Sequence, residues 1–399
     1  MRVLICASEA PLPPVNGFRL MLGALVRKLR QEHDVRVVAF RSPEQQGSPA
    51  AETDLRLLPY PEDGLLGAAL QTAGALARGR PLRADRLASP LVDPLRAELE
   101  EFAPEVVHVT SGRLAGLGRT LAGRPAVLGA LDAMHLNTEA RARAASGLRK
   151  RLLRLEVGRV RRFEATEYRR FAGVTVVSEA DRAALLEIDP SLRIDVIPNG
   201  VDVEFFAPDP DAPVDQGRIV FTGVMSYAPN VLAAEFLARE VFPRVRRERP
   251  EARLAIVGRS PASAVRALGE LPGVDVAGEV PDIRPWLRES RVYACPMTSG
   301  TGIKNKLLEA MACGVPCVAT PLALQGIGGA PGNDVLVGAH ADELANEIAR
   351  VLGDDELASR LGAAGRAYVC SAHDWGAVAR SYVRVWERAR AAASRANGS

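Results

Sequence analysis

The stretch MTSGTGIKNKLLEAMACGVP, residues 297–316, carries the strongest signal of how the chain folds. It follows an apolar run at 292–295 that has the pattern of a buried strand, and it passes through a turn with two glycines. Beyond the turn, apolar residues recur at helical spacing, at Ile303, Leu307, Leu308, Met311 and Ala312. The stretch therefore predicts a strand, a glycine turn and the start of a helix.

Such a junction directs unpaired backbone N–H groups and the positive end of the helix dipole at one point, where phosphates bind. Lys304 and Lys306 add positive charge that is costly at a helix start unless an anion is present. Glu309 is the only acid in the stretch and suits sugar hydroxyls better than a phosphate. The residues expected around a bound phosphate are Ser299, Gly300, Thr301, Gly302, Ile303, Lys304 and Lys306.

The composition indicates a two-domain globular enzyme. A chain of 399 residues exceeds one ordinary core, and 47 % hydrophobic with 25 % charged residues argues against disorder. A formal charge of +3 gives no indication of nucleic acid binding. Five scattered cysteines favour reduced core thiols over a metal site, and no metal-binding motif is present. We expect a cytoplasmic protein, because the first residues have a strand pattern and the longest uncharged run, 64–77, is too short to span a bilayer.

Strands that alternate with helices predict two doubly wound parallel sheets. In the first half the expected strands are 2–6, 35–40, 55–58, 106–109, 126–131, 174–177 and 193–197. In the second half they are 218–222, 253–257, 274–277, 292–295, 317–320 and 335–337, with helices at 230–248, 262–271, 283–289, 303–312, 341–352, 355–372 and 375–392. A linker composition at 205–217 separates the halves. We expect domains at 1–205 and 206–373, with residues 374–399 forming a helix that crosses back to the first domain.

Two positions in the first half follow strands, where open parallel sheets place ligands. Gly17 opens the first helix, so backbone could approach a bound group there, although a plain turn glycine is an equal alternative. Asp132 and His135 come just after the fifth strand and could meet a substrate hydroxyl as base or hydrogen-bond acceptor. A capping or exposed role for each is the competing interpretation.

Residues 139–170 form a long basic helical segment, with eleven Arg or Lys against four Glu. One interpretation is a peripheral contact with an anionic surface at the inner membrane face, or with an anionic acceptor. The other is a solvated helix with internal Glu–Arg pairs.

Four strings of residues resemble the retaining glycosyltransferases of family four, also called glycosyl transferases group 1, which have the GT-B fold. They are VIPNGVD at 196–202, VFTG at 220–223 with Pro229 and Asn230, AIVG at 255–258, and the segment 302–316 with its EAMACGVP ending. The resemblance implies two Rossmann-like domains facing a central cleft. It implies that the first domain binds the acceptor and that the second binds the nucleotide-sugar donor.

The resemblance also implies individual roles. Glu309 is similar to the second glutamate of the family's pair and would hold the ribose, while Thr301 stands where the first glutamate meets the donor sugar. The family's usual Arg and Lys after the first strand of this domain fall on Val224 and Pro229. The diphosphate is thereby left to Lys304, Lys306 and backbone N–H groups, and Gly223 is a further donor-binding candidate.

The expected function is a retaining, metal-independent glycosyltransferase of the hexosyltransferase type. It would move a sugar from a UDP or GDP donor to a hydroxyl of a small molecule or a lipid-linked glycan, in glycan or exopolysaccharide assembly or natural-product glycosylation, with Asp132, His135 and Lys304 as the catalytic candidates and no cofactor. A non-catalytic nucleotide-sugar binding protein is one alternative, because the first glutamate is missing. A NAD-dependent oxidoreductase is another, but residues 300–305 lack the third glycine and the following acid of that motif.

Overall fold

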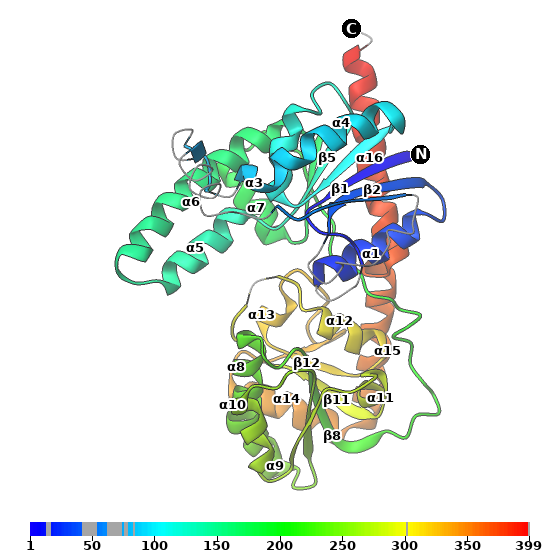
Figure 1. Cartoon of the computed structure of the whole chain (residues 1–399). Coiled ribbons are helices and arrows are strands. Elements are labelled where there is room, and N and C mark those ends of the chain that lie inside the picture. Colours follow the sequence, from blue (N-terminus) through cyan, green and yellow to red (C-terminus); the bar gives the residue numbers. More distant parts are fainter. Residues whose placement is uncertain are drawn as a thin grey trace. The chain divides into compact units, whose positions relative to one another are not determined.

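The computed structural model of the chain describes residues 1–12, 17–41, 54–61, 74–75, 79–82, 84–300 and 302–397. Their contacts divide the chain into two compact units, the first of Met1–Pro198 with Val378–Ser399 and the second of Asn199–Ala377. Figure 1 labels the elements of both units. Each unit contains a parallel sheet with helices, so the predicted pair of α/β domains is confirmed.

The first unit contains a seven-stranded sheet in the order β3-β2-β1-β4-β5-β6-β7. Its strands are β1 (Arg2–Ala7), β2 (Asp34–Phe40), β3 (Leu55–Leu58), β4 (Val106–Thr110), β5 (Ala126–Leu131), β6 (Gly173–Val176) and β7 (Ile194–Val196). Its helices are α1 (Gly17–Leu29), α3 (Ala84–Ala88), α4 (Val92–Glu101), α5 (Met134–Ala144), α6 (Gly147–Glu167) and α7 (Glu179–Ile188), with short 3₁₀ turns η2 (Ser89–Leu91), η3 (Gly112–Arg119) and η4 (Tyr168–Arg170). The first four residues of β4 are three valines and His108, and all four are buried, as expected for a strand covered on both faces.

The second unit contains a six-stranded sheet in the order β10-β9-β8-β11-β12-β13. Its strands are β8 (Asp215–Thr222), β9 (Arg253–Val257), β10 (Val274–Gly278), β11 (Ser290–Cys295), β12 (Cys317–Ala319) and β13 (Leu336–Val337). Its helical segments are α8 (Ala228–Phe236), η5 (Leu237–Val241), α9 (Phe242–Glu248), α10 (Ser263–Arg266), η6 (Ala267–Glu270), α11 (Arg284–Arg288), α12 (Asn305–Ala312), α13 (Pro321–Leu324), α14 (Ala341–Gly353) and α15 (Asp355–Ala372).

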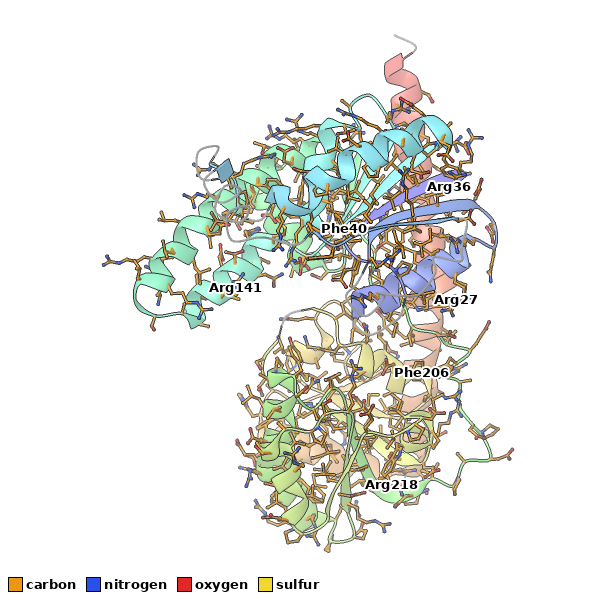
Figure 2. The ribbon with its side chains drawn as sticks, in the orientation of Figure 1. Arg27, Arg36, Phe40, Arg141, Phe206 and Arg218 are labelled. Carbon is orange, nitrogen blue, oxygen red and sulfur yellow. The ribbon has the colours of Figure 1, made fainter. Side chains whose placement is uncertain are left out.

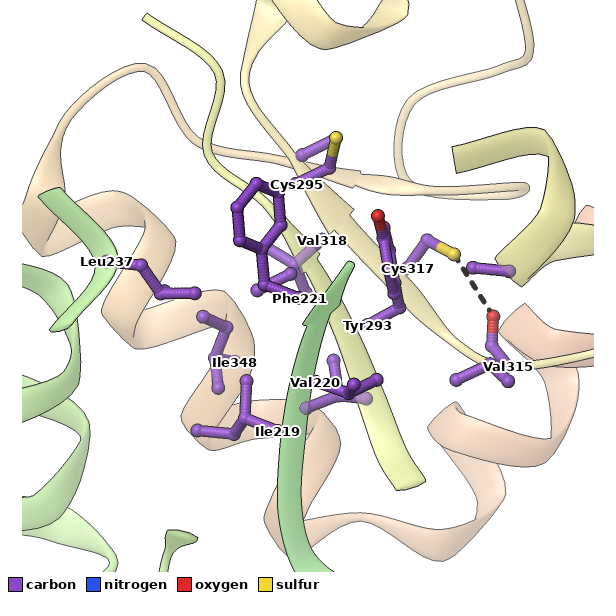
Figure 3. Close-up of a cluster of buried hydrophobic side chains, with 14 of the residues drawn as sticks. Ile219, Val220, Phe221, Leu237, Tyr293, Cys295, Val315, Cys317, Val318 and Ile348 are labelled. Carbon is purple, nitrogen blue, oxygen red and sulfur yellow. Dashed lines mark hydrogen bonds between the residues drawn. The ribbon is translucent and has the colours of Figure 1, made fainter. Parts of the chain in front are cut away.

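The core of the second unit is built on β8. Ile219, Val220 and Phe221 are fully buried, and Figure 3 shows them with Leu237 and Ile348 from the helical layers. Burial of each such side chain contributes about 1.5–3 kcal/mol to the free energy of unfolding. This core holds the carboxyl end of β8, where the candidate site lies.

Two predicted helices are interrupted in the structure. The segment 139–170 is divided into α5 and α6, because Ala145 and Ser146 are extended and Gly147 has a φ of +58°. The segment 230–248 contains the π-helical turn η5 just before Pro243, whose missing N–H cannot continue an α-helical ladder. Figure 1 shows α5 and α6 as a hairpin.

The last helix, α16 (Trp375–Asn397), has residues in both units. Trp375 packs on Gly200 in the second unit, where an added Cβ would lie 2.5 Å from the indole. Trp386 is fully buried in the first unit, and its Nε1 donates a hydrogen bond to Nδ1 of His108 at 3.3 Å. The second unit begins at Asn199, before the linker composition does, and within that composition the carbonyl of Ala207 accepts a hydrogen bond from Arg288 at 2.7 Å.

Candidate functional site

The candidate site lies at the topological switch point of the second sheet. β8 pairs with β9 on one side and with β11 on the other, and the strand order reverses there. In open parallel sheets, ligands bind outside the carboxyl ends of the strands at such a point. The segments that follow β8 and β11 are the ones that the sequence singled out.

Two glycines let the backbone segments after β8 and β9 approach each other closely. A Cβ added to Gly258 would lie 1.6 Å from the carbonyl oxygen of Gly223, so no other residue fits there. A Cβ on Gly223 would in turn lie 2.8 Å from Nδ2 of Asn230 and 3.0 Å from Nζ of Lys306. Asn230 and Lys306 therefore lie directly over the backbone at the end of β8.

The turn after β11 depends on two left-handed glycines and one lysine. Gly300 and Gly302 have φ values of +99° and +80°. Nζ of Lys304 donates hydrogen bonds to their carbonyl oxygens, at 3.1 Å and 2.6 Å. Lys304 is buried and precedes α12 as its N-cap residue, and its burial lowers the pKa of its amine. Lys304 was expected on the first turn of the helix; the structure places it just before that turn, where the carbonyls of Gly300 and Gly302 bind its ammonium.

Lys306 is the lysine on the first turn of α12. Its Nζ donates a hydrogen bond to Oδ1 of Asn230 and lies 5.0 Å from the centre of the Phe221 ring. Burial lowers the pKa of this amine. The charge is thus held close to the end of β8.

Glu309 and Ser299 supply polar groups without protein partners. Burial raises the pKa of the Glu309 carboxyl to about 7, and the nearby Lys306 opposes this shift. No described residue donates a hydrogen bond to that carboxyl. The hydroxyl of Ser299 is buried and has no partner among the described residues. An unpartnered buried hydroxyl such as that of Ser299 is unfavourable, and Glu309 is only half-buried, so this arrangement favours a ligand with hydroxyl or phosphate groups.

Two predicted residues of this segment remain. Ile303 is half-buried and packs against the core of the second unit. Thr301 lies outside the described residues.

The other predicted residues belong to the first unit. Gly17 begins α1 and is exposed, with no atom within 4 Å of an added Cβ, so a ligand can approach its backbone. Asp132 is half-buried after β5, its Oδ2 accepts a hydrogen bond from Nδ2 of Asn137 at 2.6 Å, and burial raises its pKa. His135 is buried, and its Nδ1 lies 2.7 Å from Oε2 of Glu164. His135 therefore belongs to a buried pair, which the capping or exposed interpretation did not foresee.

Sequence reasoning did not assign a role to Asn230, Gly258 or Glu164. Asn230 and Gly258 lie within the strings that carried the resemblance, so the sequence could have indicated that they belong to the site. Glu164 could not have been paired with His135, because the predicted helix was continuous and its break sets the register between α5 and α6.

Comparison with solved structures defines the class of fold. The structure is similar to sucrose-phosphate synthase from Thermosynechococcus elongatus, with a TM-score of 0.71, 18 % identity and coverage of 98 % of this chain and 100 % of that one. It is also similar to HepE of Anabaena in complex with UDP, with a TM-score of 0.66, 16 % identity and coverage of 97 % and 100 %. The chain therefore has the GT-B fold.

Sequence comparison gives the family. The family described as Glycosyltransferase Family 4 matches residues 15–205, and the one described as Glycosyl transferases group 1 matches residues 216–354. The two matches account for most of both units, and the chain belongs to this group of glycosyltransferases.

Curated relatives are similar over part of their length. The phosphatidyl-myo-inositol mannosyltransferase of Mycobacterium tuberculosis is 32 % identical over 237 residues, which is 55 % of this chain and 60 % of that protein. A GDP-mannose-dependent alpha-(1-6)-phosphatidylinositol monomannoside mannosyltransferase of Mycolicibacterium smegmatis is 30 % identical over 230 residues, which is 51 % and 58 % of the two chains. The similarity thus spans about three fifths of each relative.

The raised pKa of Glu309 predicts a pH-dependent stability. The carboxyl ionises more easily in the unfolded chain, so its ionisation opposes folding above about pH 4.5, and fully so above about pH 7. We expect Glu309→Gln to raise the free energy of unfolding at pH 8 by on the order of 1–3 kcal/mol and to change it little near pH 5. Urea unfolding at the two pH values measures this, with the exposed Glu356→Gln as control. An equal effect of Glu309→Gln at both pH values would contradict the assignment.

Proposed function

We propose that the protein is a retaining glycosyltransferase that moves a sugar from a nucleotide diphosphate to an acceptor hydroxyl. The observation that carries the proposal is the carboxyl of Glu309, which accepts no hydrogen bond from a described residue and lies in α12, the helix that follows the glycine turn at the switch point of the second sheet. A carboxylate there can accept both hydroxyls of a ribose. The names of the relatives favour mannose from GDP-mannose as the first donor to try, with UDP-sugars second.

Departure of the nucleotide builds negative charge on the β-phosphate. The start of α12 and the charge of Lys306 lie beside the backbone of Gly223, where they favour that charge in the transition state over the ground state. Lys304 stabilises the glycine turn, whose backbone N–H groups would bind the phosphate. In this mechanism the leaving phosphate takes the proton of the acceptor hydroxyl on the same face of the sugar, and Asp132 orients the acceptor. The proposed mechanism requires no metal ion.

We further propose that the α5–α6 hairpin contacts an anionic membrane surface. Leu148, Leu152 and Leu155 are 72 %, 58 % and 63 % exposed and recur at helical spacing. The cations near this stripe that form no ion pair with a described carboxylate are Arg141, Arg149, Lys150, Arg151 and Arg154. Among the described residues, no helix is long and apolar enough to cross a bilayer. A basic helix with exposed leucines suits contact with the surface instead.

Nucleotide binding tests the donor site. We expect one of GDP, UDP, ADP and TDP to bind preferentially in calorimetry without added metal, GDP first. Glu309→Ala is expected to weaken that binding about 10-fold to 100-fold, because charge-assisted hydrogen bonds contribute roughly 1.5–3 kcal/mol. The exposed Glu356→Ala should bind as the unchanged protein does. Slow release of nucleotide from the matching donor without acceptor is also expected.

Binding of none of the four nucleotides, or binding that Glu309→Ala leaves unchanged, would remove the donor site from this position. Binding without any nucleotide release from donor sugars would instead support a non-catalytic nucleotide-sugar binding protein.

Sedimentation with lipid vesicles tests the membrane contact. The protein should bind vesicles that contain anionic lipid, bind neutral vesicles weakly, and dissociate as salt is raised. Replacing Leu148 and Leu155 together by Ser should weaken binding by about tenfold or more, since each buried leucine contributes about 1.5–3 kcal/mol. The exposed Leu232→Ser on α8 is the matched control. An equal loss in the control would show that the leucines of α6 have no special role.

A further inference from the structure

His373 follows α15 as its C-cap residue and is fully buried, and its ring joins two segments that are far apart in the sequence. Its Nδ1 lies 2.8 Å from the carbonyl oxygen of Asn199, and its Nε2 lies 2.8 Å from the carbonyl oxygen of Ile327. Both distances are typical of hydrogen bonds. The ring therefore contacts two carbonyl groups at once.

The two contacts together require two protons on the His373 ring. A carbonyl oxygen only accepts hydrogen bonds, and a neutral imidazole has a single N–H group. Only the imidazolium, which has an N–H on each nitrogen, can donate to both oxygens. In the neutral form, a nitrogen lone pair would face a carbonyl oxygen at 2.8 Å and repel it.

His108 in the first unit is a buried histidine with the opposite arrangement. Its Nδ1 accepts a hydrogen bond from Nε1 of Trp386, which can only donate. Burial lowers the pKa of His108 to about 3, so this ring is neutral. The second proton of His373 therefore comes from its two carbonyl partners and not from burial.

Three segments meet at the His373 ring, namely 199–202, 325–334 and 368–375. Their other titratable side chains are those of Asp202, Asp334, Tyr368, Cys370 and Asp374. Within the part of the chain that the structure describes, none of these carboxylates forms an ion pair with the ring. Each of the three accepts a hydrogen bond from a backbone N–H group instead. The protonated ring thus depends on the two carbonyl groups.

The two carbonyl groups differ in how far they can move. Ile327 is buried in the core of the second unit, and its carbonyl also accepts a hydrogen bond from the Tyr368 hydroxyl at 2.7 Å. Asn199 is half-buried, and no other described residue donates to its carbonyl. When the ring loses a proton, the oxygen that can separate from it and bind water is therefore that of Asn199.

Asn199 connects the His373 ring to the candidate donor site. Its Nδ2 donates a hydrogen bond to Oδ1 of Asn305 at 3.3 Å. Asn305 is the first residue of α12, and it stands between the ammonium groups of Lys304 and Lys306. The position of Asn199 therefore affects the helix start that is proposed to bind the diphosphate.

The rest of this segment is fixed by other contacts. The N–H of Val201 donates to the backbone carbonyl of His373 at 2.7 Å. Phe206, which Figure 2 labels, packs against the core of the second unit. Asn199 is thus the part of the segment that depends on the ring.

We propose that His373 is a proton-dependent positioning residue of the donor site. With two protons its ring holds Asn199, which in turn holds the first turn of α12 where the nucleotide diphosphate binds. With one proton it releases Asn199, and the nucleotide binds more weakly. Histidine changes charge between pH 5 and 8, so the effect falls in that range. The effect on the nucleotide rests on the proposed function, whereas the two-proton state rests on the contacts of His373 itself.

Nitrogen-15 NMR of the histidine rings tests the protonation. We expect both ring nitrogens of His373 to carry a proton at pH 5.5, and Nδ1 to have lost it at pH 8. The spectrum of His373→Gln assigns the signals, and His108 should stay neutral at both pH values. A His373 ring that is neutral at pH 5.5, or that does not change between the two pH values, would overturn the proposal.

Calorimetry at pH 5.5 and 8 tests the effect on the donor site, with whichever of GDP, UDP, ADP and TDP binds best. The ratio of the two affinities should be about fivefold or more larger in the unchanged protein than in His373→Gln. Glu309 and the nucleotide phosphates also titrate in this range, but they are the same in both proteins. The exposed His340→Gln is the control and should keep the ratio within about twofold. Equal ratios in the unchanged protein and in His373→Gln would overturn the proposal.

Two further variants separate positioning from general stability. In His373→Asn the amide nitrogen takes the place of Nδ1 and can hold Asn199, so binding should be tight at both pH values. In His373→Gln it takes the place of Nε2, so binding should be weak at both. Equal losses in these two variants would show a merely structural role and would overturn the proposal.

Asn199→Ala tests the link without changing the buried ring. It keeps the carbonyl that His373 contacts and removes the hydrogen bond to Asn305. Because Asn199 is half-buried, this variant should fold even where those of His373 do not. We expect weak nucleotide binding at both pH values, while the His373 ring titrates as before. A ratio of affinities as large as in the unchanged protein would overturn the proposal.

The two proposals can fail separately. If none of the four nucleotides binds, the proposed function fails, and the NMR signals still decide the protonation of His373. If a nucleotide binds and Glu309→Ala weakens it, but His373→Gln leaves the pH dependence unchanged, the function stands and the positioning role of His373 is wrong.

Discussion

The close contact between the backbones of Gly223 and Gly258 is the constraint on which the candidate donor site depends. A Cβ on Gly258 would lie 1.6 Å from the carbonyl oxygen of Gly223, so the segments after β8 and β9 can meet only without side chains. The space that remains above Gly223 is filled by Asn230 and Lys306. The helix start of α12 and the carboxyl of Glu309 are positioned by the same buried core.

In both units the candidate site lies at the same place in the sheet, but the side chains there differ. In each sheet the polar and strained residues gather at the carboxyl ends of the strands where the order reverses, between β1 and β4 or between β8 and β11. The second unit presents a carboxyl, a hydroxyl and a helix start, which suit a nucleotide diphosphate. The first presents a cavity lined by apolar side chains, by arginines and by the carboxylates of Asp132 and Glu156. The two candidate sites differ in these side chains and not in the fold, which both units share.

Strands and the glycine turn were predictable from the sequence, because buried parallel strands are continuous apolar runs and left-handed turns require glycine. The strands 55–58, 126–131 and 253–257 were predicted to the residue. Contacts between distant segments could not be predicted. Lys304 binds carbonyls of its own turn, and His135 pairs with Glu164 across a helix break that no periodicity revealed. The cavity of the first unit escaped prediction for the same reason, since its lining comes from six separate parts of the chain that only the folded sheet brings together.

Hydrogen–deuterium exchange with and without the preferred nucleotide diphosphate tests the central claim most directly, because it locates the ligand without any substitution. The account predicts slower exchange in peptides that cover 297–312 and 223–230, and unchanged exchange in α5 and α6. Slower exchange confined to the first unit, or none at 297–312 when calorimetry shows that the nucleotide is bound, would contradict the assignment of the donor site to the glycine turn and Glu309.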